Sequence, residues 1–236
     1  MQDSLESGDN GMAATSDPIQ LFTKQHATYE RFIHLVRYPH GIRSFFLESP
    51  LLESGFRVLD AGCGTGVITI ALNDALMRRS MPVESLHAFD LTPAMLEHFA
   101  AKLRARGGPV VELRQANVLK PETLPDDWSG YDLIVSASML EYVPREQLAD
   151  ALSNLRQRLG RHGTLIVFIT KRNWLTRPLV GSWWQSNLYE RDGLQAAFQR
   201  AGFGDVEFAG FPAAAAHLSL WGHILVARCH RQGLRA

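Results

Sequence analysis

The sequence predicts an α/β fold built on a mostly parallel sheet. From Phe56 onward, short apolar runs alternate with segments whose apolar residues recur at helical spacing. A glycine-rich turn at residues 62–66 follows the first of these runs, at a point where a strand of such a sheet turns into a helix. The chain has 236 residues, of which 46% are apolar and 20% charged, a balance typical of a globular chain. We therefore expect a single core, with right-handed crossovers and helices on both faces of the sheet.

The region before the first strand divides into a tail and two helices. Residues 1–16 hold few apolar side chains, so we expect a disordered tail there. Asp17 and Pro18 are typical of an N-cap and a first helical residue. Helical spacing continues to residue 38, and a second short helix is expected over 42–51. The prediction is one domain over 17–236, with cap helices within 17–53.

The remaining elements follow in alternation. The first five strands are expected at 57–59, 85–89, 110–113, 131–136 and 164–169, with helices over 67–76, 93–103 and 144–159. The fifth strand is apolar throughout, which favours burial on both faces. The alternation then stops over 170–189, a length typical of a functional loop, so we predict a lid insertion there. A helix over 192–200 and two strands near 205–211 and 222–229 complete the chain.

The composition and the positions of the charged residues limit the partner and the compartment. Twenty-four basic and 24 acidic side chains give no net charge, so no nucleic acid is expected. Two cysteines cannot build a disulfide framework and fit a reducing compartment. The first basic residue is Lys24, so the basic start of a secretory signal is missing, and we expect a cytoplasmic location.

One segment is long enough to be tested as a membrane span. Residues 208–227 contain no Asp, Glu, Lys or Arg. Two glycines, a proline and two histidines interrupt them, and the run of four alanines at 213–216 adds little hydrophobicity. We therefore expect two strands around a loop here and no membrane span.

The glycine-rich turn points to a cationic nucleoside ligand. The run Val58-Leu59-Asp60-Ala61-Gly62-Cys63-Gly64-Thr65-Gly66 departs from the dinucleotide pattern G-x-G-x-x-G, because the third glycine would stand at position 67. Asp60 would also repel a pyrophosphate resting on the helix N-terminus. The same carboxylate would attract a ligand that combines an ammonium and a sulfonium with a nucleoside.

Other polar residues stand at neighbouring strand ends. Asp90 ends the second strand, where an acidic side chain can accept both hydroxyls of a ribose, although it can also be a simple turn residue. Asn117 follows the third strand and can bond an adenine edge. The fourth strand ends at Ser136, and the segment up to Glu141 faces the same crevice.

Together these pieces resemble the class I S-adenosylmethionine-dependent methyltransferases. The matching motifs are VLDAGCGTG (58–66), DLTPAML (90–96), ANV (116–118), YDLIVSASMLEYVP (131–144) and LYERDGLQAAFQRAGF (188–203). The resemblance implies a Rossmann-like seven-stranded sheet of order 3-2-1-4-5-7-6 in which strand 7 is antiparallel. It also implies S-adenosylmethionine as the cofactor.

The resemblance also assigns the residues expected to bind this cofactor. It implies that Asp60, Gly62 and Gly64 hold the methionine end, Asp90 the ribose, Leu91 the adenine face, and Asn117 and Val118 the adenine edge, with Ser136 at the same site. The family more often has Asp where Asn117 stands. An Asn keeps an acceptor, so we expect the adenine contact to survive.

The segment around Glu141 is similar to that of ubiquinone-type and other small-molecule O-methyltransferases. Some of these hold a divalent metal on a Glu followed four residues later by Glu-His. Here Ala137 and Tyr142 replace two of those positions, so we expect no metal. Glu141 remains a candidate general base, or a carboxylate paired with an arginine such as Arg145.

Further candidates lie in the cap and in the lid. His26 and Tyr29 stand on the N-terminal helix that often covers the site in this family, and His217 is a third candidate; each histidine can also be a surface or packing residue. Trp183, Trp184 and Arg172 are the candidate substrate residues. The alternative is that the tryptophans only cap the hydrophobic edge of the sheet.

The sequence thus predicts methyl transfer to a small, apolar or aromatic acceptor, by O- or N-methylation. Two alternatives remain open. One is a protein or RNA methyltransferase, and the other is a non-catalytic subunit that binds the cofactor.

Overall fold

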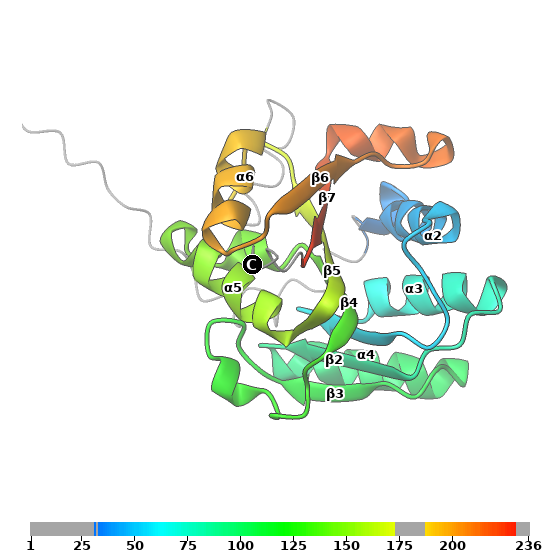
Figure 1. Cartoon of the computed structure of the whole chain (residues 1–236). Coiled ribbons are helices and arrows are strands. Elements are labelled where there is room, and N and C mark those ends of the chain that lie inside the picture. Colours follow the sequence, from blue (N-terminus) through cyan, green and yellow to red (C-terminus); the bar gives the residue numbers. More distant parts are fainter. Residues whose placement is uncertain (1–30, 32, 173–186, 230–236) are drawn as a thin grey trace, which may run out of the picture.

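A seven-stranded sheet of order β3-β2-β1-β4-β5-β7-β6 forms the centre of the computed structural model (Figure 1). The model describes residues 31, 33–172 and 187–229. Its strands are β1 (Arg57–Ala61), β2 (Ser85–Asp90), β3 (Glu112–Gln115), β4 (Tyr131–Ala137), β5 (Leu159–Thr170), β6 (Asp205–Ala209) and β7 (Gly222–Arg228). β7 pairs antiparallel with both β5 and β6, and the pairs among β1 to β5 are parallel. The predicted order and the antiparallel β7 are confirmed.

Helices cover both faces of this sheet. Among the described residues the α-helices are α2 (Tyr38–Glu48), α3 (Val67–Arg78), α4 (Pro93–Arg106), α5 (Leu148–Arg158) and α6 (Arg191–Arg200). Short 3-10 helices are η1 (Pro121–Thr123), η2 (Leu140–Tyr142), η3 (Arg145–Gln147) and η5 (Ala213–Leu220). Figure 1 shows α2 and α3 on one face of the sheet and α5 and α6 on the other.

Alternating side chains divide the interior into two main cores. Leu59 and Ile134 belong to the core under α5 and α6, whereas Val58 and Leu133, their chain neighbours, belong to the core under α2 and α3. This is the two-residue period of strands that are buried on both faces. Residues 165–169 of β5 are at most 3% exposed, as expected for the strand between β4 and β7.

Several boundaries differ from the sequence predictions. β3 begins at Glu112 and not at Val110, whose side chain is 96% exposed at the sheet edge. The predicted helix over 144–159 divides into η3 and α5. β5 begins five residues early, at Leu159, where its pairing to β4 shifts register. Such shifts cannot be derived from apolar periodicity, because they depend on which neighbouring strand supplies the hydrogen bonds.

The segment tested as a membrane span forms the end of β6, the helix η5 and most of β7. This is the expected arrangement of two strands around a connection. Within the described ranges no helix is long and apolar enough to cross a membrane.

Candidate active site

The glycine-rich turn after β1 requires glycine for two reasons. Gly62 and Gly66 have φ angles of 75° and 83°, in the left-handed region that side chains disfavour. A Cβ at Gly62 would also overlap Met139, and one at Gly66 would overlap Phe99. The turn is therefore packed directly against the segment after β4 and against α4.

Asp90 at the end of β2 holds this turn in place. Its Oδ2 accepts the Gly64 N–H at 2.8 Å, and its Oδ1 accepts the Thr92 N–H at 2.8 Å. Burial raises the pKa of Asp90, while these hydrogen bonds oppose the shift. A carboxylate offers about four acceptor positions, so both oxygens keep acceptor capacity for a ligand.

Asp60 lies beneath the turn and is 1% exposed. The Thr69 hydroxyl donates to Oδ2, whereas Oδ1 has no partner among the described residues. The pKa of Asp60 is raised to about 7, chiefly because the carboxyl is buried; the Asp90 charge adds to the rise and the Thr69 hydrogen bond opposes it. An unpaired buried carboxylate oxygen is costly, which marks this position as one that favours a cation.

A cavity of about 320 Å³, here called the strand-end cavity, opens at the carboxyl ends of β1 to β4. Its volume lies in the range of ligand sites. Six of the predicted cofactor residues line it together: Gly62, Gly64, Asp90, Leu91, Asn117 and Val118. Asp60 and Ser136, both 1% exposed, lie behind its wall. Ser138, two residues beyond Ser136, lines the cavity instead.

Asn117 uses its amide oxygen within its own turn. Oδ1 accepts the Leu119 N–H at 2.9 Å, and the Asn117 N–H donates to the Thr123 hydroxyl at 3.0 Å. One acceptor position of Oδ1 therefore remains for a ligand.

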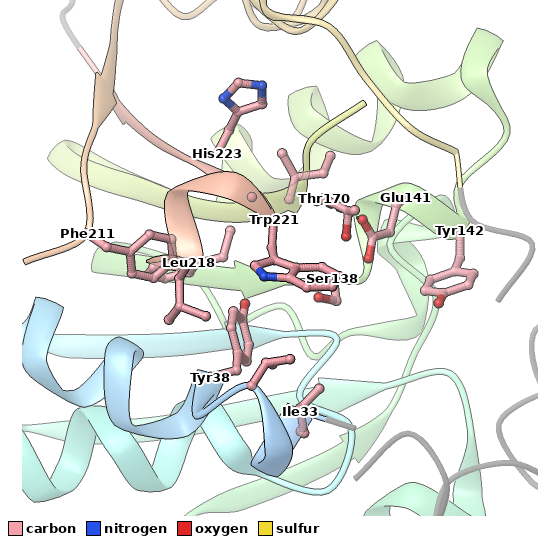
Figure 2. Close-up of a pocket in the computed structure, with 14 residues that line it drawn as sticks. Ile33, Tyr38, Ser138, Glu141, Tyr142, Thr170, Phe211, Leu218, Trp221 and His223 are labelled. Atoms are coloured by element: carbon pink, nitrogen blue, oxygen red, sulfur yellow. Dashed lines mark hydrogen bonds between the residues drawn. The ribbon is translucent and has the colours of Figure 1, made fainter. Parts of the chain in front are cut away.

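A second, smaller cavity of about 70 Å³ adjoins the first and is here called the Trp221 cavity (Figure 2). Four residues line both cavities: Ile33, Tyr38, Ser138 and Tyr142. The others that line the Trp221 cavity are Val36, Glu141, Phe168, Ile169, Thr170, Phe211, Leu218, Trp221, Gly222 and His223. Its walls are mainly apolar and come from four separate stretches of the chain.

Glu141 is the acidic residue of this cavity, and its side chain is 2% exposed. Its Oε2 accepts the Thr170 N–H at 2.9 Å. Burial raises the pKa of Glu141, and hydrogen bonds from Thr170 and Ser138 oppose that rise. Glu141 is therefore held by neutral donors, inside an apolar enclosure.

The expected alternative, pairing of Glu141 with Arg145, is wrong. The Arg145 guanidinium donates to the Leu188 carbonyl at 2.6 Å and lies over the Tyr189 ring, 4.9 Å from its centroid. The two residues stand on separate 3-10 helices with Pro144 between them. They therefore do not have the spacing that a continuous helix would give them.

Other predicted residues lie away from both cavities or outside the described residues. His26, Tyr29, Trp183 and Trp184 fall in the latter group. Arg172 forms an ion pair with Glu190 at 3.3 Å and lines a separate open hollow. His217 is exposed, with Nε2 3.0 Å from the Val36 carbonyl.

Sequence reasoning missed the role of the β6–β7 connection. Trp221, Leu218 and Phe211 from this connection form one side of the Trp221 cavity. η5 packs against α2 so closely that a Cβ at Gly41 would overlap Leu218. An apolar stretch with a tryptophan, inserted between two paired strands, was the available signal, but His217 was the one residue of this stretch predicted to have a function.

Comparison with known proteins decides the family. Residues 58–163 match the sequence profile of the methyltransferase domain family, over the strands that build the strand-end cavity. These residues therefore form a class I S-adenosylmethionine-dependent methyltransferase domain. S-adenosylmethionine is the cofactor of this family.

Two curated relatives differ in what their names say they methylate. The 2-methyl-6-phytyl-1,4-hydroquinone methyltransferase 1 of Oryza sativa subsp. japonica is 27% identical over 181 residues, 76% of this methyltransferase and 51% of the rice protein. The ribosomal protein L11 methyltransferase of Bacillus subtilis (strain 168) is 27% identical over 156 residues, 66% of this chain and 40% of that protein. The chain thus spans about half, or less, of the length of these relatives.

A solved structure shows the same fold over most of the chain. Magnesium protoporphyrin IX methyltransferase from Synechocystis PCC 6803, solved with bound S-adenosylhomocysteine, aligns with a TM-score of 0.62 at 16% identity. The alignment covers 90% of this methyltransferase and 99% of the Synechocystis chain.

Proposed function

We propose that this protein transfers the methyl group of S-adenosylmethionine to an oxygen or nitrogen atom of a small acceptor that is apolar or aromatic around the reacting atom. The observation that carries the proposal is the junction of the two cavities. The strand-end cavity is lined by the family's motif residues, and the Trp221 cavity beside it is apolar with one buried carboxylate. Ser138 and Tyr142 line both cavities, so a ligand in each would meet there.

The residues of the strand-end cavity fit the cofactor. The remaining acceptor positions of Asp90 suit the ribose hydroxyls. Asp60 lies behind the cavity wall, so its carboxylate would favour the ammonium of the methionine end by its charge and not by direct contact. Asn117 and Val118 line the same cavity, which supports their proposed contact with the adenine edge. The cofactor supplies a methyl group already activated on a sulfonium, so the protein has mainly to align the acceptor and exclude water.

The walls of the Trp221 cavity support a small acceptor with an apolar or aromatic body. Phe168 and Phe211 pack against each other at a centroid distance of 6.3 Å. Tyr38 and Trp221 reach toward each other across the cavity (Figure 2). The rice relative is named for a hydroquinone acceptor, which also favours an aromatic acceptor bearing hydroxyl groups.

A protein acceptor is the competing candidate, because the B. subtilis relative is named for a ribosomal protein. Incubation with radiolabelled methyl donor and cell extract, followed by separation into small molecules, protein and RNA, distinguishes the candidates. We expect label in the small-molecule fraction, and none above background with the Asp90→Ala variant. Label confined to protein or RNA would overturn the proposal. Calorimetry with S-adenosylhomocysteine tests cofactor binding independently of the acceptor.

A further inference from the structure

We propose that the acceptor presents an un-ionised hydroxyl or amine to the Trp221 cavity, that Glu141 takes its proton, and that carboxylate acceptors are excluded by the charge of Glu141. The inference rests on the proposed function and deepens it, because it names the chemical class of the acceptor. Three features of the cavity carry it: the position of Glu141, the kinds of residue around it, and the volume available.

Glu141 lines the Trp221 cavity and is held next to Ser138, which lines both cavities. Ser138, which lines both, hydrogen-bonds to the Glu141 carboxylate and has a φ angle of 54°, unusual for a residue with a side chain. Its N–H donates to the Phe168 carbonyl at 2.9 Å, which fixes the turn after β4 beside β5. The Thr170 N–H at the end of β5 then holds Oε2 of Glu141. Backbone strain of this kind persists where the surrounding structure maintains it, often at functional sites.

The residues that line the cavity offer no cation to a second carboxylate. Neither Lys nor Arg is among the described residues that line it. His223 stands at its rim, but the ring points away from the other labelled side chains (Figure 2). Burial, followed by the nearby charges of Lys171 and Arg191, lowers the pKa of His223 to about 4, so the ring is neutral near pH 7. A carboxylate acceptor would therefore lie beside a buried carboxylate with no compensating charge.

The charged groups behind Glu141 do not supply a cation to the Trp221 cavity. Tyr189 and Arg145 approach from outside the cavity, where the Arg145 guanidinium lies over the Tyr189 ring, and Glu146 is exposed. The pKa of Tyr189 is raised to about 12, chiefly because the phenol is buried; the Glu141 charge adds to the rise and the Arg145 charge opposes it. The Tyr189 phenol is therefore neutral near pH 7. Burial alone raises the pKa of Glu141, and its hydrogen-bond donors are neutral.

The volume restricts which part of the acceptor enters. About 70 Å³ holds several water-sized groups, which suits one ring bearing its reactive atom. Larger portions of an acceptor would have to extend out of the cavity. The cavity thus recognises the reactive end of the acceptor and leaves the remainder unspecified.

The step balances without any further reactant. The acceptor oxygen or nitrogen forms its bond to the methyl carbon as the carbon–sulfur bond breaks, and the sulfur keeps that electron pair. The acceptor proton passes to the Glu141 carboxylate and is released to solvent after the product leaves. The products are the methylated acceptor, S-adenosylhomocysteine and one proton.

Binding measurements test the charge argument without turnover. Phenol, aniline and benzoate have similar size and differ in the group presented to Glu141. Each is titrated into the protein saturated with S-adenosylhomocysteine, with NMR line broadening of the probe as the readout. We expect phenol and aniline to bind about tenfold more tightly than benzoate, and Glu141→Gln to reduce that ratio to about twofold, because the repelling charge is gone.

Turnover tests the proton transfer, with the small-molecule fraction of cell extract as the source of acceptor. Glu141→Gln should lower the rate of label incorporation about a hundredfold, the usual effect of removing a general base. It should leave the affinity for S-adenosylhomocysteine within about twofold, because Glu141 does not line the strand-end cavity. The wild-type rate should fall as the pH drops below the raised pKa of Glu141, since the base must be ionised. Glu146→Gln, an exposed carboxyl five residues along, is the matched control and should change none of these values.

Three results would overturn the inference while leaving the proposed function intact. They are benzoate binding as tightly as phenol, no binding by any of the three probes, and a Glu141→Gln rate within about threefold of wild type. Failure of the wild type to bind S-adenosylhomocysteine or to label the small-molecule fraction would instead contradict the proposed function itself.

Discussion

The strand-end cavity and the Trp221 cavity share a boundary but are assembled in different ways. The first is built mainly from turns that directly follow β1, β2, β3 and β4, with Ile33 and Tyr38 added from the segment before β1, so most of its polar groups are fixed by the strand before them. The second combines the segment before α2, the segment after β4, the end of β5 and the β6–β7 connection. The proposed cofactor site is therefore encoded in short local motifs, whereas the shape of the proposed acceptor site depends on packing between distant segments. Substitutions should separate the two properties.

The largest effect is expected from Gly62→Ala. The new Cβ would overlap Met139 at a φ angle of 75°, which should lower the free energy of unfolding by about 2–4 kcal/mol and weaken binding of S-adenosylhomocysteine. Gly55→Ala is the matched control, because its φ angle is 79° and nothing lies within 4 Å of the new Cβ. It should cost only about 1–2 kcal/mol of stability and leave calorimetric affinity unchanged. Equal affinity losses in both variants would show that strain alone accounts for the effect.

Asp90→Ala should come next, because it removes acceptors that serve both the turn and the expected ribose. We expect S-adenosylhomocysteine affinity to fall by about 1.5–3 kcal/mol. Calorimetry provides the measurement, and Asp74→Ala on exposed α3 surface is the control. Unchanged binding in the Asp90 variant would remove this residue from the cofactor site.

Trp221→Ala should affect the other cavity. We expect the acceptor KM to rise about tenfold, since one aromatic wall is lost, with the affinity for S-adenosylhomocysteine unchanged. Trp221→Phe should restore much of the KM because it keeps an aromatic ring. A parallel loss of cofactor affinity would show that the two cavities are energetically one site.

The pH dependence of cofactor binding should isolate Asp60. Its pKa of about 7 leaves the ligand-free carboxyl largely protonated below that pH, and a bound ammonium favours the ionised form. S-adenosylhomocysteine affinity should therefore rise as the pH increases through about 7, with release of a proton that calorimetry in two buffers detects. Asp60→Asn should flatten this profile. A profile that persists in the variant would assign the titration to the neighbouring Asp90, whose pKa is also raised by burial.

His217→Ala should give the smallest effect. It removes an exposed contact to the Val36 carbonyl, for which we expect a loss of at most about 1 kcal/mol in the free energy of unfolding. Acceptor KM and cofactor affinity should stay the same. A large fall in the rate of methyl transfer would restore His217 as a candidate base.

The sequence predicted the sheet and the residues that directly follow its strands. Apolar alternation located the strands, and the resemblance supplied the sheet order that the structure confirms. Gly62, Gly64 and Asp90 were correctly placed at one cavity because parallel strands bring their carboxyl ends to the same edge. These expectations required no knowledge of how distant segments pack.

The Trp221 cavity could not be predicted in the same way. Nothing local to Tyr38 indicates that it faces Trp221, 183 residues later in the chain. Glu141 was singled out, but its partner was misassigned, because the spacing rule applies within one helix and Pro144 separates two short ones. The hydrogen bond from Thr170 comes from a different strand and has no sequence signal.

The β6–β7 connection also suggests how new specificities arise on this scaffold. The two strands pair from Asp205 with Arg228 to Ala209 with Ile224, and this pairing does not involve residues 210–221. A connection of another length or composition can therefore replace it without shifting the sheet or the strand-end cavity. Gly41 limits what can replace it, because the new connection must pack against α2 at a position that has no side chain. Exchange of this surface segment therefore changes one of the four stretches that line the proposed acceptor cavity, and a chimera that carries it from a relative should shift acceptor preference toward that of the donor.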